Sequence, residues 1–596
     1  MVEQELEVYQ APEARYFKTK TEFDEAVGKD FIEHANRITA KGVQFFVGLS
    51  HGISPAGAYQ YIIDRYSKIQ HPELIYYTFV NSPLKRQRDL IGVTDAGMFL
   101  KYLFRKGYIN RSQILGSTMN RDNMAVFTQE LNATVGTYLQ EQGKQGLDYA
   151  FLASDTTGRV AGLSRKSTAF ESDDIVVLVK DGKEEEATVT PSFLLKTRRT
   201  VFLATKADKR RPLAWLYYQW GKSNESPSFL RYMDNVEERM TVFIDDKALT
   251  WPQIEVKRDT PYGETIIRVD LAKTFNEQAA KKVPVILMVH GFLGLNTFDG
   301  LLTAISSTQY MAAAMHYGSV PNDLPTKEYS KHVARNIDAV ITFFGDLGHD
   351  VYLFDHSMAN IYFLMMDRNI DDYPGFKKYL RGRIGSNPFF GEEAKWAILG
   401  FMDNVLIPSV SMLSQPIEKA LFLAMRQVIP IDTKHNVRDR SINLTERLIK
   451  AESGAREQLW KEVRHRVTTL MSGMGALPHL DRIPIIQALN KIPAKIFVIQ
   501  IYSALLESKA FDKQKGLHNM QQLNIPILIL KSDKDVVANF VKRIYDDGYT
   551  EIRDVTNLGE KQPFREHLYF MINPRQVSQI VEAFISDAEE QRNQHQ

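Results

Sequence analysis

Short apolar runs alternate with amphipathic segments along this chain, and the alternation occurs twice in series. In the first half, the segments between the runs, such as 95–107 and 123–143, have the apolar spacing of helices. Strands that alternate with helices predict a parallel sheet with helices on its faces. Residues 1–250 are therefore expected to form one α/β domain. Its predicted strands are 42–50, 74–80, 147–154, 174–180 and 200–205, and the pattern closes near 240–249.

The second alternation begins with a predicted antiparallel hairpin, in which 253–259 and 264–272 are joined by a four-residue turn, 260–263. A mostly helical insertion rich in Met, Leu, Ile and Phe is predicted between about 376 and 515. Insertions of this size in α/β domains often cover the active site. Residues 251–596 are thus expected to form a second α/β domain with a large helical cap. Its other predicted elements are strands 284–290, 350–355 and 526–532 and helices 328–348 and 574–588.

The length also predicts at least two domains, because a chain of 596 residues is too long to fold around one ordinary hydrophobic core. The balance of 74 basic against 72 acidic residues argues against a nucleic-acid partner and a membrane-coating basic face. The lack of cysteine excludes disulfides, thiolate metal sites and cysteine nucleophiles. The acidic start of the chain lacks an apolar signal segment, and no uncharged apolar run reaches membrane-spanning length. We expect a cytoplasmic protein without a transmembrane segment; the sequence does not indicate its oligomeric state.

The stretch VYLFDHSMANIYF, residues 351–363, places Ser357 in a tight turn between an apolar strand and an apolar helix. Serine hydrolases often carry Gly-x-Ser-x-Gly at such a turn. Here Asp355 and Ala359 occupy the two glycine positions. Ala359 adds one methyl group, whereas Asp355 adds both bulk and a charge near the site. We expect Asp355 to hydrogen-bond neighbouring loop amides or to raise the pKa of a nearby catalytic histidine.

A serine hydroxyl becomes a good nucleophile when a base takes its proton and an acid orients that base. His567 lies after the last predicted strand, and Asp535 follows the strand 526–532. The candidates therefore occur in the order Ser, Asp, His that suits a strand-to-helix nucleophile turn. Asp533 is an alternative to Asp535 for the acid. In an alternative interpretation, Ser357 only caps the following helix and is not a nucleophile.

The reaction also needs two backbone amides directed at the negative oxygen that develops on the substrate. Phe292 follows a buried strand in the segment His290-Gly291-Phe292. Its amide and that of Met358, directly after the candidate nucleophile, are the predicted oxyanion hole. His290 is expected to support the loop that carries Phe292.

Taken together, these pieces make residues 252–596 resemble an α/β-hydrolase in order, strand context and approximate spacing. The resemblance implies a covalent acyl-enzyme on Ser357, which water activated by His567 then hydrolyses. It also implies that the reaction requires no metal and no cofactor.

The first domain contains FFVGLSHGISPAGAYQYI, residues 45–62, which is a strand, a small-residue loop and the start of a helix. Backbone amides in such a loop can hold a phosphate group. Together with the segments 146–163, 189–213 and 227–249, it makes residues 15–250 resemble the 6-phosphogluconolactonase/glucosamine-6-phosphate deaminase family. The resemblance implies a Rossmann-like parallel-sheet domain.

Within this resemblance, the family's Gly-Gly-Ser-Thr-Pro loop corresponds to His51-Gly52-Ile53-Ser54-Pro55. The family's phosphate-contacting lysine corresponds to Lys209 in ATKADK. The resemblance thus makes Ser54 and Lys209 candidate phosphate ligands for a sugar phosphate. A solvated surface lysine is the alternative for Lys209.

The family's catalytic residues are absent. Where it has Asp-Glu-Arg or Asp-Glu-Tyr after the second strand, this chain has Phe79-Val80-Asn81-Ser82, and where it has Asp-Gly-His, this chain has Thr157-Gly158-Arg159. General acid–base catalysis therefore has no obvious agent in this domain. Arg159 could instead bind an anion through two parallel hydrogen bonds. We expect a non-catalytic relative, either a phosphosugar-binding domain or a scaffold.

The leading hypothesis for the whole chain is a serine hydrolase that acts on a carboxylic ester, a thioester or a lactone. The apolar insertion favours a small-molecule substrate with a hydrophobic acyl part, although an ordinary helical lid has the same composition. One alternative is a phosphosugar-binding or scaffold protein built from two degenerate enzyme domains. The other is an acyltransferase, in which the same triad delivers the acyl group to an alcohol instead of water.

Overall fold

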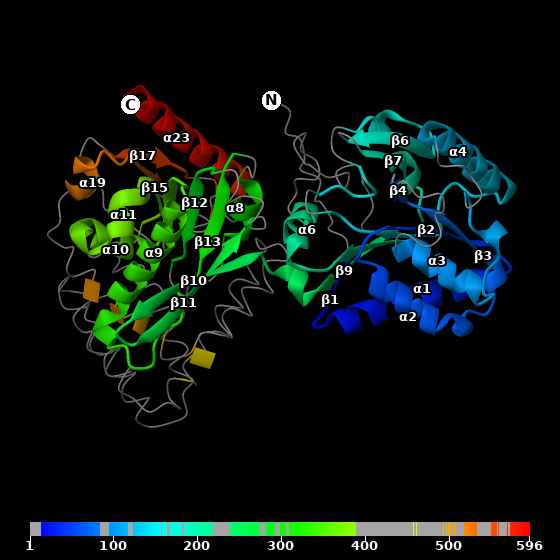
Figure 1. The fold of residues 1–596 in the computed structure, drawn as a ribbon, viewed down its shortest axis with the longest axis horizontal. Coiled ribbons are helices and arrows are strands. Elements are labelled where there is room, and N and C mark those ends of the chain that lie inside the picture. The colour runs from blue at the N-terminus through cyan, green and yellow to red at the C-terminus, as the bar shows by residue number, and fades with distance from the viewer. Residues whose placement is uncertain are drawn as a thin grey trace. The chain divides into compact units, whose positions relative to one another are not determined.

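The computed structural model contains two compact units, Met1–Trp251 and Pro252–Gln596 (Figure 1). Each unit is built around its own β-sheet. The structure describes residues 13–83, 95–116, 123–155, 158–163, 167–181, 184–217, 239–272, 275, 282–291, 298–305, 309–388, 457, 460–461, 493, 496, 499–500, 502–503, 506–507, 518–532, 550–556, 558, 569 and 573–595.

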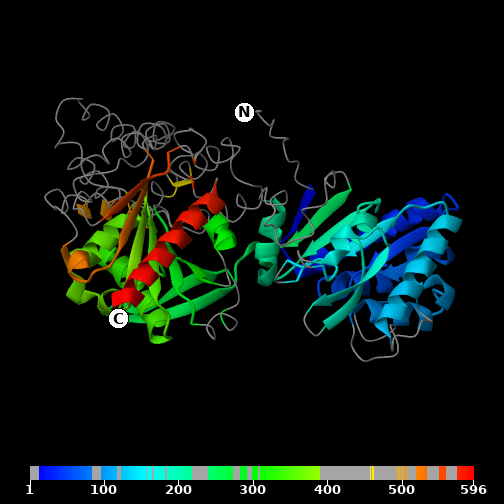
Figure 2. The same ribbon diagram turned by 90° about the horizontal axis from the view of Figure 1, so that it is seen from above.

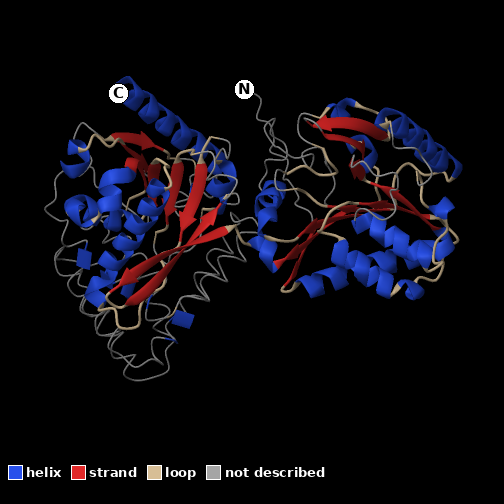
Figure 3. Ribbon diagram, viewed as in Figure 1, coloured by secondary structure: helices blue, strands red, loops and turns tan. Residues whose placement is uncertain are grey.

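The N-terminal unit has a six-stranded parallel sheet in the order β1-β9-β8-β5-β2-β3. Its central strands are buried along their whole length, as the uniformly apolar segment FFVGL of β2 requires. Helices α1, α2 and α3 lie along one face of this sheet (Figure 3). The strands are β1 (Glu13–Phe17), β2 (Phe45–Leu49), β3 (Ile75–Phe79), β5 (Tyr149–Leu152), β8 (Thr200–Ala204) and β9 (Met240–Asp245). The helices of the unit include α1 (Lys20–Thr39), α2 (Ala56–Asp64), α3 (Asp95–Arg105), α4 (Met124–Glu141), α5 (Pro191–Leu194) and α6 (Arg210–Tyr217).

One predicted strand of this unit belongs to a different sheet. The segment predicted at 174–180 forms β6 (Val176–Asp181), which pairs antiparallel with β7 (Glu184–Val189). β7 pairs in turn with β4 (Asn81–Pro83), which makes a separate three-stranded sheet. The prediction that this segment joins the parallel sheet is wrong, because a two-residue connection permits only an antiparallel hairpin.

The C-terminal unit has an eight-stranded sheet in the order β10-β11-β13-β12-β14-β15-β16-β17. β11 runs antiparallel to both of its neighbours, and all the other pairings in this sheet are parallel. The predicted hairpin at its start is confirmed, with Thr260 opposite Gly263 across the turn. The strands are β10 (Gln253–Thr260), β11 (Gly263–Leu271), β12 (Val285–Val289), β13 (Met311–Met315), β14 (Val351–His356), β15 (Leu380–Ser386), β16 (Ile527–Lys531) and β17 (Glu551–Asp554).

The helices of this unit cover both faces of its sheet. Figure 2 shows the C-terminal helix α23 running across the sheet beside α8, and the two helices are in contact. α9 and α10 pack on each other and on the neighbouring strands. The helices are α8 (Asp299–Ala304), α9 (Tyr329–Asp346), α10 (Ala359–Arg368), α11 (Pro374–Tyr379), α19 (His518–Gln522) and α23 (Pro574–His595).

The predicted cap at about 376–515 begins too early. Its first part contains β15, which pairs with both β14 and β16 inside the sheet. The sequence LRGRIGS does not read as a buried strand, because it holds two glycines and two arginines. A Cβ atom at Gly382 would lie 2.7 Å from the Tyr352 ring, so neighbouring side chains occupy the space that an apolar residue would fill. Most of the remaining range lies outside the described residues.

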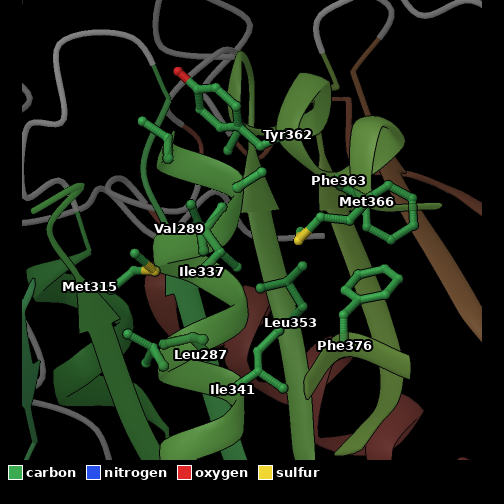
Figure 4. Packing of buried hydrophobic residues seen from close by; sticks show 14 of the residues in the cluster. Leu287, Val289, Met315, Ile337, Ile341, Leu353, Tyr362, Phe363, Met366 and Phe376 are labelled. Carbon is green, nitrogen blue, oxygen red and sulfur yellow. The ribbon is translucent and has the colours of Figure 1, made fainter. Parts of the chain in front are cut away.

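The core between the sheet and helices α9, α10 and α11 is apolar (Figure 4). Leu287 and Leu353 project from the strands toward Ile337 and Ile341 of α9. The alternation of strand side chains places Leu353 and Asp355 on the same face of β14, toward α10. The core therefore surrounds the end of β14, where the candidate nucleophile follows.

Asp338 of α9 is expected to make the stability of this unit depend on pH. Its Oδ1 accepts a hydrogen bond from the Phe376 amide at 2.6 Å, and burial raises the pKa of the carboxyl to about 6. Because the folded pKa lies above the ordinary value of 3.8, the stability that this group contributes at pH 4 is lost as the pH rises through 6. Asp338→Asn keeps an acceptor for the amide but cannot ionise. We expect it to raise the free energy of unfolding by about 2 kcal/mol at pH 7.5.

The measurement is chemical unfolding of the parent and of Asp338→Asn at pH 7.5 and at pH 4.5. The increase in the free energy of unfolding should be much smaller at pH 4.5 than at pH 7.5, because the carboxyl of the folded parent is itself mostly protonated at pH 4.5. Equal effects of the substitution at the two pH values would contradict the assignment.

Candidate active site

Ser357 occupies the turn between β14 and α10 with a left-handed backbone, φ +52°. This conformation is uncommon for a residue with a Cβ atom and is typically kept at functional turns. The Ser357 amide donates to the Ser386 carbonyl oxygen at 3.0 Å, and the side chain is largely buried. The N-cap residue of α10 is Met358, and no side chain caps this helix end. The assignment of Met358 as the N-cap residue argues against the alternative hypothesis that Ser357 serves only as a helix cap.

Gly291 brings the chain after β12 directly against this turn. A Cβ atom added to Gly291 would lie 3.0 Å from the Ser357 Cβ atom and 3.1 Å from the His356 carbonyl oxygen. The Tyr317 hydroxyl donates to the carbonyl oxygens of His290 and of Gly291, the latter at 2.9 Å, which fixes the backbone at this point. The predicted contributor Phe292 lies outside the described residues. Of the two predicted oxyanion-hole residues, the structure describes Met358, which is buried.

His290 is completely buried beside this backbone. Its ring stacks on Phe298 with the centroids 4.9 Å apart, and neither ring nitrogen has a hydrogen-bond partner among the described residues. Burial holds the pKa of this histidine well below its ordinary value, and the nearby His316 adds to that effect. His290 is therefore a neutral packing residue next to Gly291.

Asp355 makes contacts that differ from those expected. Its carboxylate forms a bidentate ion pair with Arg383 of β15, with Oδ1 2.6 Å from Nε and Oδ2 2.8 Å from Nη2. Arg383 Nη2 also donates to Asn360 Oδ1 at 2.6 Å, and its guanidinium lies 3.6 Å from the centroid of the Phe363 ring. Burial raises the pKa of the Asp355 carboxyl, and the guanidinium opposes this shift. The main partner of Asp355 is thus a buried arginine and not the loop amides of the prediction, whereas an effect of Asp355 on the pKa of His567 stays a prediction.

Ser386 and Asn387, at the carboxyl end of β15, connect this turn to two later parts of the chain. Ser386 Oγ lies 2.8 Å from the Tyr569 hydroxyl. Asn387 donates its amide to the Leu530 carbonyl oxygen at 2.8 Å and accepts from the Ser532 amide through Oδ1 at 3.0 Å. These contacts carry no signal in the sequence, because their partners are more than 140 residues apart.

The remaining members of the predicted triad are Asp535 and His567. Both residues, and the alternative acid Asp533, lie outside the described residues.

In the N-terminal unit, the three predicted phosphate ligands follow the carboxyl ends of three adjacent strands. Ser54 comes after β2, Arg159 after β5 and Lys209 after β8, and these strands are neighbours in the parallel sheet. Parallel strands place their carboxyl ends at one edge, where ligands of α/β sheets bind. Ser54 is buried just before α2, whereas Lys209 is partly exposed.

Carboxylates that the sequence did not single out lie beside Asn81 and Arg159. Arg159 Nε lies 2.5 Å from Asp155 Oδ2, so its guanidinium is already engaged in an ion pair. Asn81 Nδ2 donates to Glu186 Oε1 at 2.5 Å. Glu186 stands in the charged run EEEATV of β7, which reads as a solvated strand and gives no sign of this contact.

Within the described ranges, no group of histidine and carboxylate side chains could hold a metal ion. In the same part of the chain, no helix has both the length and the apolar character needed to cross a membrane.

No protein-family model and no curated protein sequence matches the chain. Solved structures that are similar include 6-phosphogluconolactonase from Trypanosoma brucei, at 13% identity and a TM-score of 0.33, covering 40% of this chain and 97% of that one. The enzyme of the same name from Thermotoga maritima has 13% identity and a TM-score of 0.32, covering 39% of this chain and 100% of that one. A monomeric glucosamine-6-phosphate deaminase has 14% identity and a TM-score of 0.31, covering 40% and 98%. The N-terminal region of this chain thus resembles solved lactonases and a deaminase, and the similarity covers 40% of the whole chain.

Proposed function

We propose that the C-terminal unit is an α/β-hydrolase that uses Ser357 as its nucleophile. The order of the eight strands, with a single reversed strand second from the edge, supports this fold. The observation that carries the proposal is Ser357 itself. It is a buried serine with φ +52° between a buried strand and a helix, with the backbone of Gly291 packed against it.

His567 is the proposed base and Asp535 the acid that orients it. Ser532 and Tyr569 both contact the end of β15, the same strand whose Ser386 carbonyl holds the Ser357 amide. Asp535 is three residues from Ser532 and His567 is two residues from Tyr569. This proximity supports a triad centred on Ser357.

In the proposed reaction, Ser357 Oγ attacks the carbonyl carbon of an ester, a thioester or a lactone while His567 takes its proton. The amides of Phe292 and Met358 stabilise the negative oxygen of the tetrahedral intermediate. The carbon–oxygen or carbon–sulfur bond then breaks, and the leaving group receives the proton from His567. Water, deprotonated by His567, attacks the acyl-enzyme, releases the acid and returns the proton to Ser357. The apolar composition of the predicted cap favours a substrate with a hydrophobic acyl part.

Covalent labelling with a fluorophosphonate probe tests this proposal. The parent protein should be labelled at Ser357, and Ser357→Ala should not be labelled. The matched control is Ser330→Ala, since Ser330 is a buried serine of α9 whose hydroxyl has no partner among the described residues. The control should be labelled like the parent. Equal labelling of Ser357→Ala and the parent would exclude Ser357 as the nucleophile.

We further propose that the N-terminal unit binds a sugar phosphate without transforming it. The convergence of Ser54, Arg159 and Lys209 on the ends of adjacent strands supports a phosphate site. The absence of the family's acid and base from the segments 79–82 and 157–159 favours binding over catalysis.

Calorimetric titration with 6-phosphogluconate and with glucosamine 6-phosphate measures this binding. Lys209→Ala is expected to weaken it at least about tenfold, because a charge-assisted hydrogen bond is lost. Lys196→Ala is the control, since Lys196 is an exposed lysine that precedes β8 and so lies at the opposite end of the strands. Identical affinities of the parent and Lys209→Ala would contradict this site.

A further inference from the structure

Ser386 contacts both His356, the last residue of β14, and Ser357, the candidate nucleophile that follows it. Its carbonyl oxygen accepts from the Ser357 amide at 3.0 Å. The same oxygen and Ser386 Oγ lie 3.1 Å and 3.2 Å from His356 Nδ1. A carbonyl oxygen can only accept, so a neutral His356 carries its hydrogen on Nδ1 and donates toward Ser386. Ser386 therefore fixes the backbone of Ser357 and the ring of His356 at once.

Tyr569 extends these contacts to the C-terminal part of the chain. Its hydroxyl lies 2.8 Å from Ser386 Oγ, and the side chains of both residues are completely buried. The resulting chain of hydrogen bonds runs from His356 through Ser386 to Tyr569. A buried hydroxyl that loses its hydrogen-bond partner costs free energy, so the three side chains have one preferred arrangement.

We propose that Ser386 and Tyr569 are positioning residues for the reaction at Ser357; this inference rests on the proposed function. Tyr569 is two residues after His567 in the chain. Its bond to Ser386 therefore places a residue two positions from the proposed base against the strand end that contacts Ser357. The contact between Ser386 and Ser357 is the backbone hydrogen bond from the Ser357 amide to the Ser386 carbonyl oxygen, so in this proposal the two side chains act on the reaction through the backbone.

A positioning role predicts a change in the chemical step without a change in substrate binding. A misplacement of about 1 Å between reacting groups can cost about a hundredfold in rate. Tyr569→Phe keeps the ring and removes only the hydroxyl, and Ser386→Ala removes only Oγ. We expect each substitution to lower kcat for nitrophenyl acetate, and the rate constant of fluorophosphonate labelling, by about ten- to a hundredfold with KM unchanged.

The test compares the parent, Tyr569→Phe, Ser386→Ala and the double variant, with Tm measured for each. Since the Tyr569 hydroxyl acts through its bond to Ser386 Oγ, the double variant should be no slower than the slower single variant within about twofold. Tyr310→Phe is the control, because that hydroxyl bonds the Glu582 carbonyl oxygen at 3.3 Å, away from the turn. The control should keep the parent rate.

Labelling of Tyr569→Phe and Ser386→Ala at the parent rate would overturn the inference, and so would losses that multiply in the double variant. A fall in rate that follows the fall in Tm, with Tyr310→Phe equally affected, would also overturn it. These outcomes differ from a failure of the proposed function, in which Ser357→Ala itself remains labelled and active.

Discussion

Replacing Ser357 by alanine is expected to lower kcat/KM for nitrophenyl ester hydrolysis by about four orders of magnitude or more. The substitution removes the attacking oxygen, so only transition-state stabilisation by the oxyanion hole and substrate binding remain. His567→Gln should cause a loss of the same order. The double variant should be no worse than either single one, because nucleophile and base act as a unit. Steady-state kinetics with short- and long-chain nitrophenyl esters measure these effects.

The same assay decides which aspartate orients the base. Asp535→Asn is expected to lower kcat by about a hundredfold to ten-thousandfold, because the histidine loses the group that fixes its orientation and stabilises its charged form. Asp533→Asn, two positions away, is the matched control and should change kcat by less than about tenfold. The reverse result would assign the acid to Asp533. Full activity in the Ser357→Ala and His567→Gln variants would contradict the triad as a whole.

The parts of the fold that could be predicted from the sequence are those where burial dictates residue type. β2 and β12 are buried on both faces, so each is an uninterrupted apolar run, and β14 is an apolar run as far as Phe354. β15 was missed because this interior strand is not an apolar run. It contains glycines, and its buried Arg383 is neutralised by an ion pair. β13, with the sequence MAAAM, was missed because alanine carries no preference for strands. β6 was assigned to the wrong sheet because strand composition does not reveal the pairing partner.

The candidate site follows the same rule. Ser357 could be predicted because a strand, a tight turn and a helix are all visible within thirteen consecutive residues. The partner of Asp355 could not be predicted, since Arg383 is 28 positions away in a segment that the sequence assigns to the cap. The contacts of Ser386 were also invisible, because a serine at a strand end has many uses and its partner Tyr569 lies 183 positions away.

Replacing Asp355 by alanine is expected to destabilise the C-terminal unit by about 3–5 kcal/mol. The substitution leaves the Arg383 guanidinium buried without its carboxylate, and removing one partner of a buried ion pair exposes the full desolvation cost of the other. The side chains of both residues are at most 1% exposed, so water cannot replace the missing partner. Chemical unfolding measures the loss. Lys377→Ala is the control, because its ion pair with Asp371 is exposed and should be worth less than about 1 kcal/mol.

Removing both charges together is expected to cost much less than removing one. In Asp355→Ala/Arg383→Met, the methionine can pack against the Phe363 ring where the guanidinium now lies, and no buried charge remains. The double variant should therefore be at least about 2 kcal/mol more stable than Asp355→Ala. A double variant as unstable as the sum of the single ones would show that the two side chains act independently.

The ion pair explains how this chain keeps a left-handed strand-to-helix turn at Ser357 without the first glycine of the usual motif. That glycine normally lets the helix approach the strand, and a carboxylate at the same position requires a space and a counter-charge. The space exists because Gly385 stands opposite Asp355, where a Cβ atom would lie 3.0 Å from Arg383 Nη2. The counter-charge comes from Arg383, which also bonds Asn360 of α10 and so joins helix and strand. If this account is correct, Asp355→Ala/Arg383→Met should keep the parent rate of fluorophosphonate labelling once folded. A folded double variant that is not labelled would instead mean that the pair orients Ser357 directly.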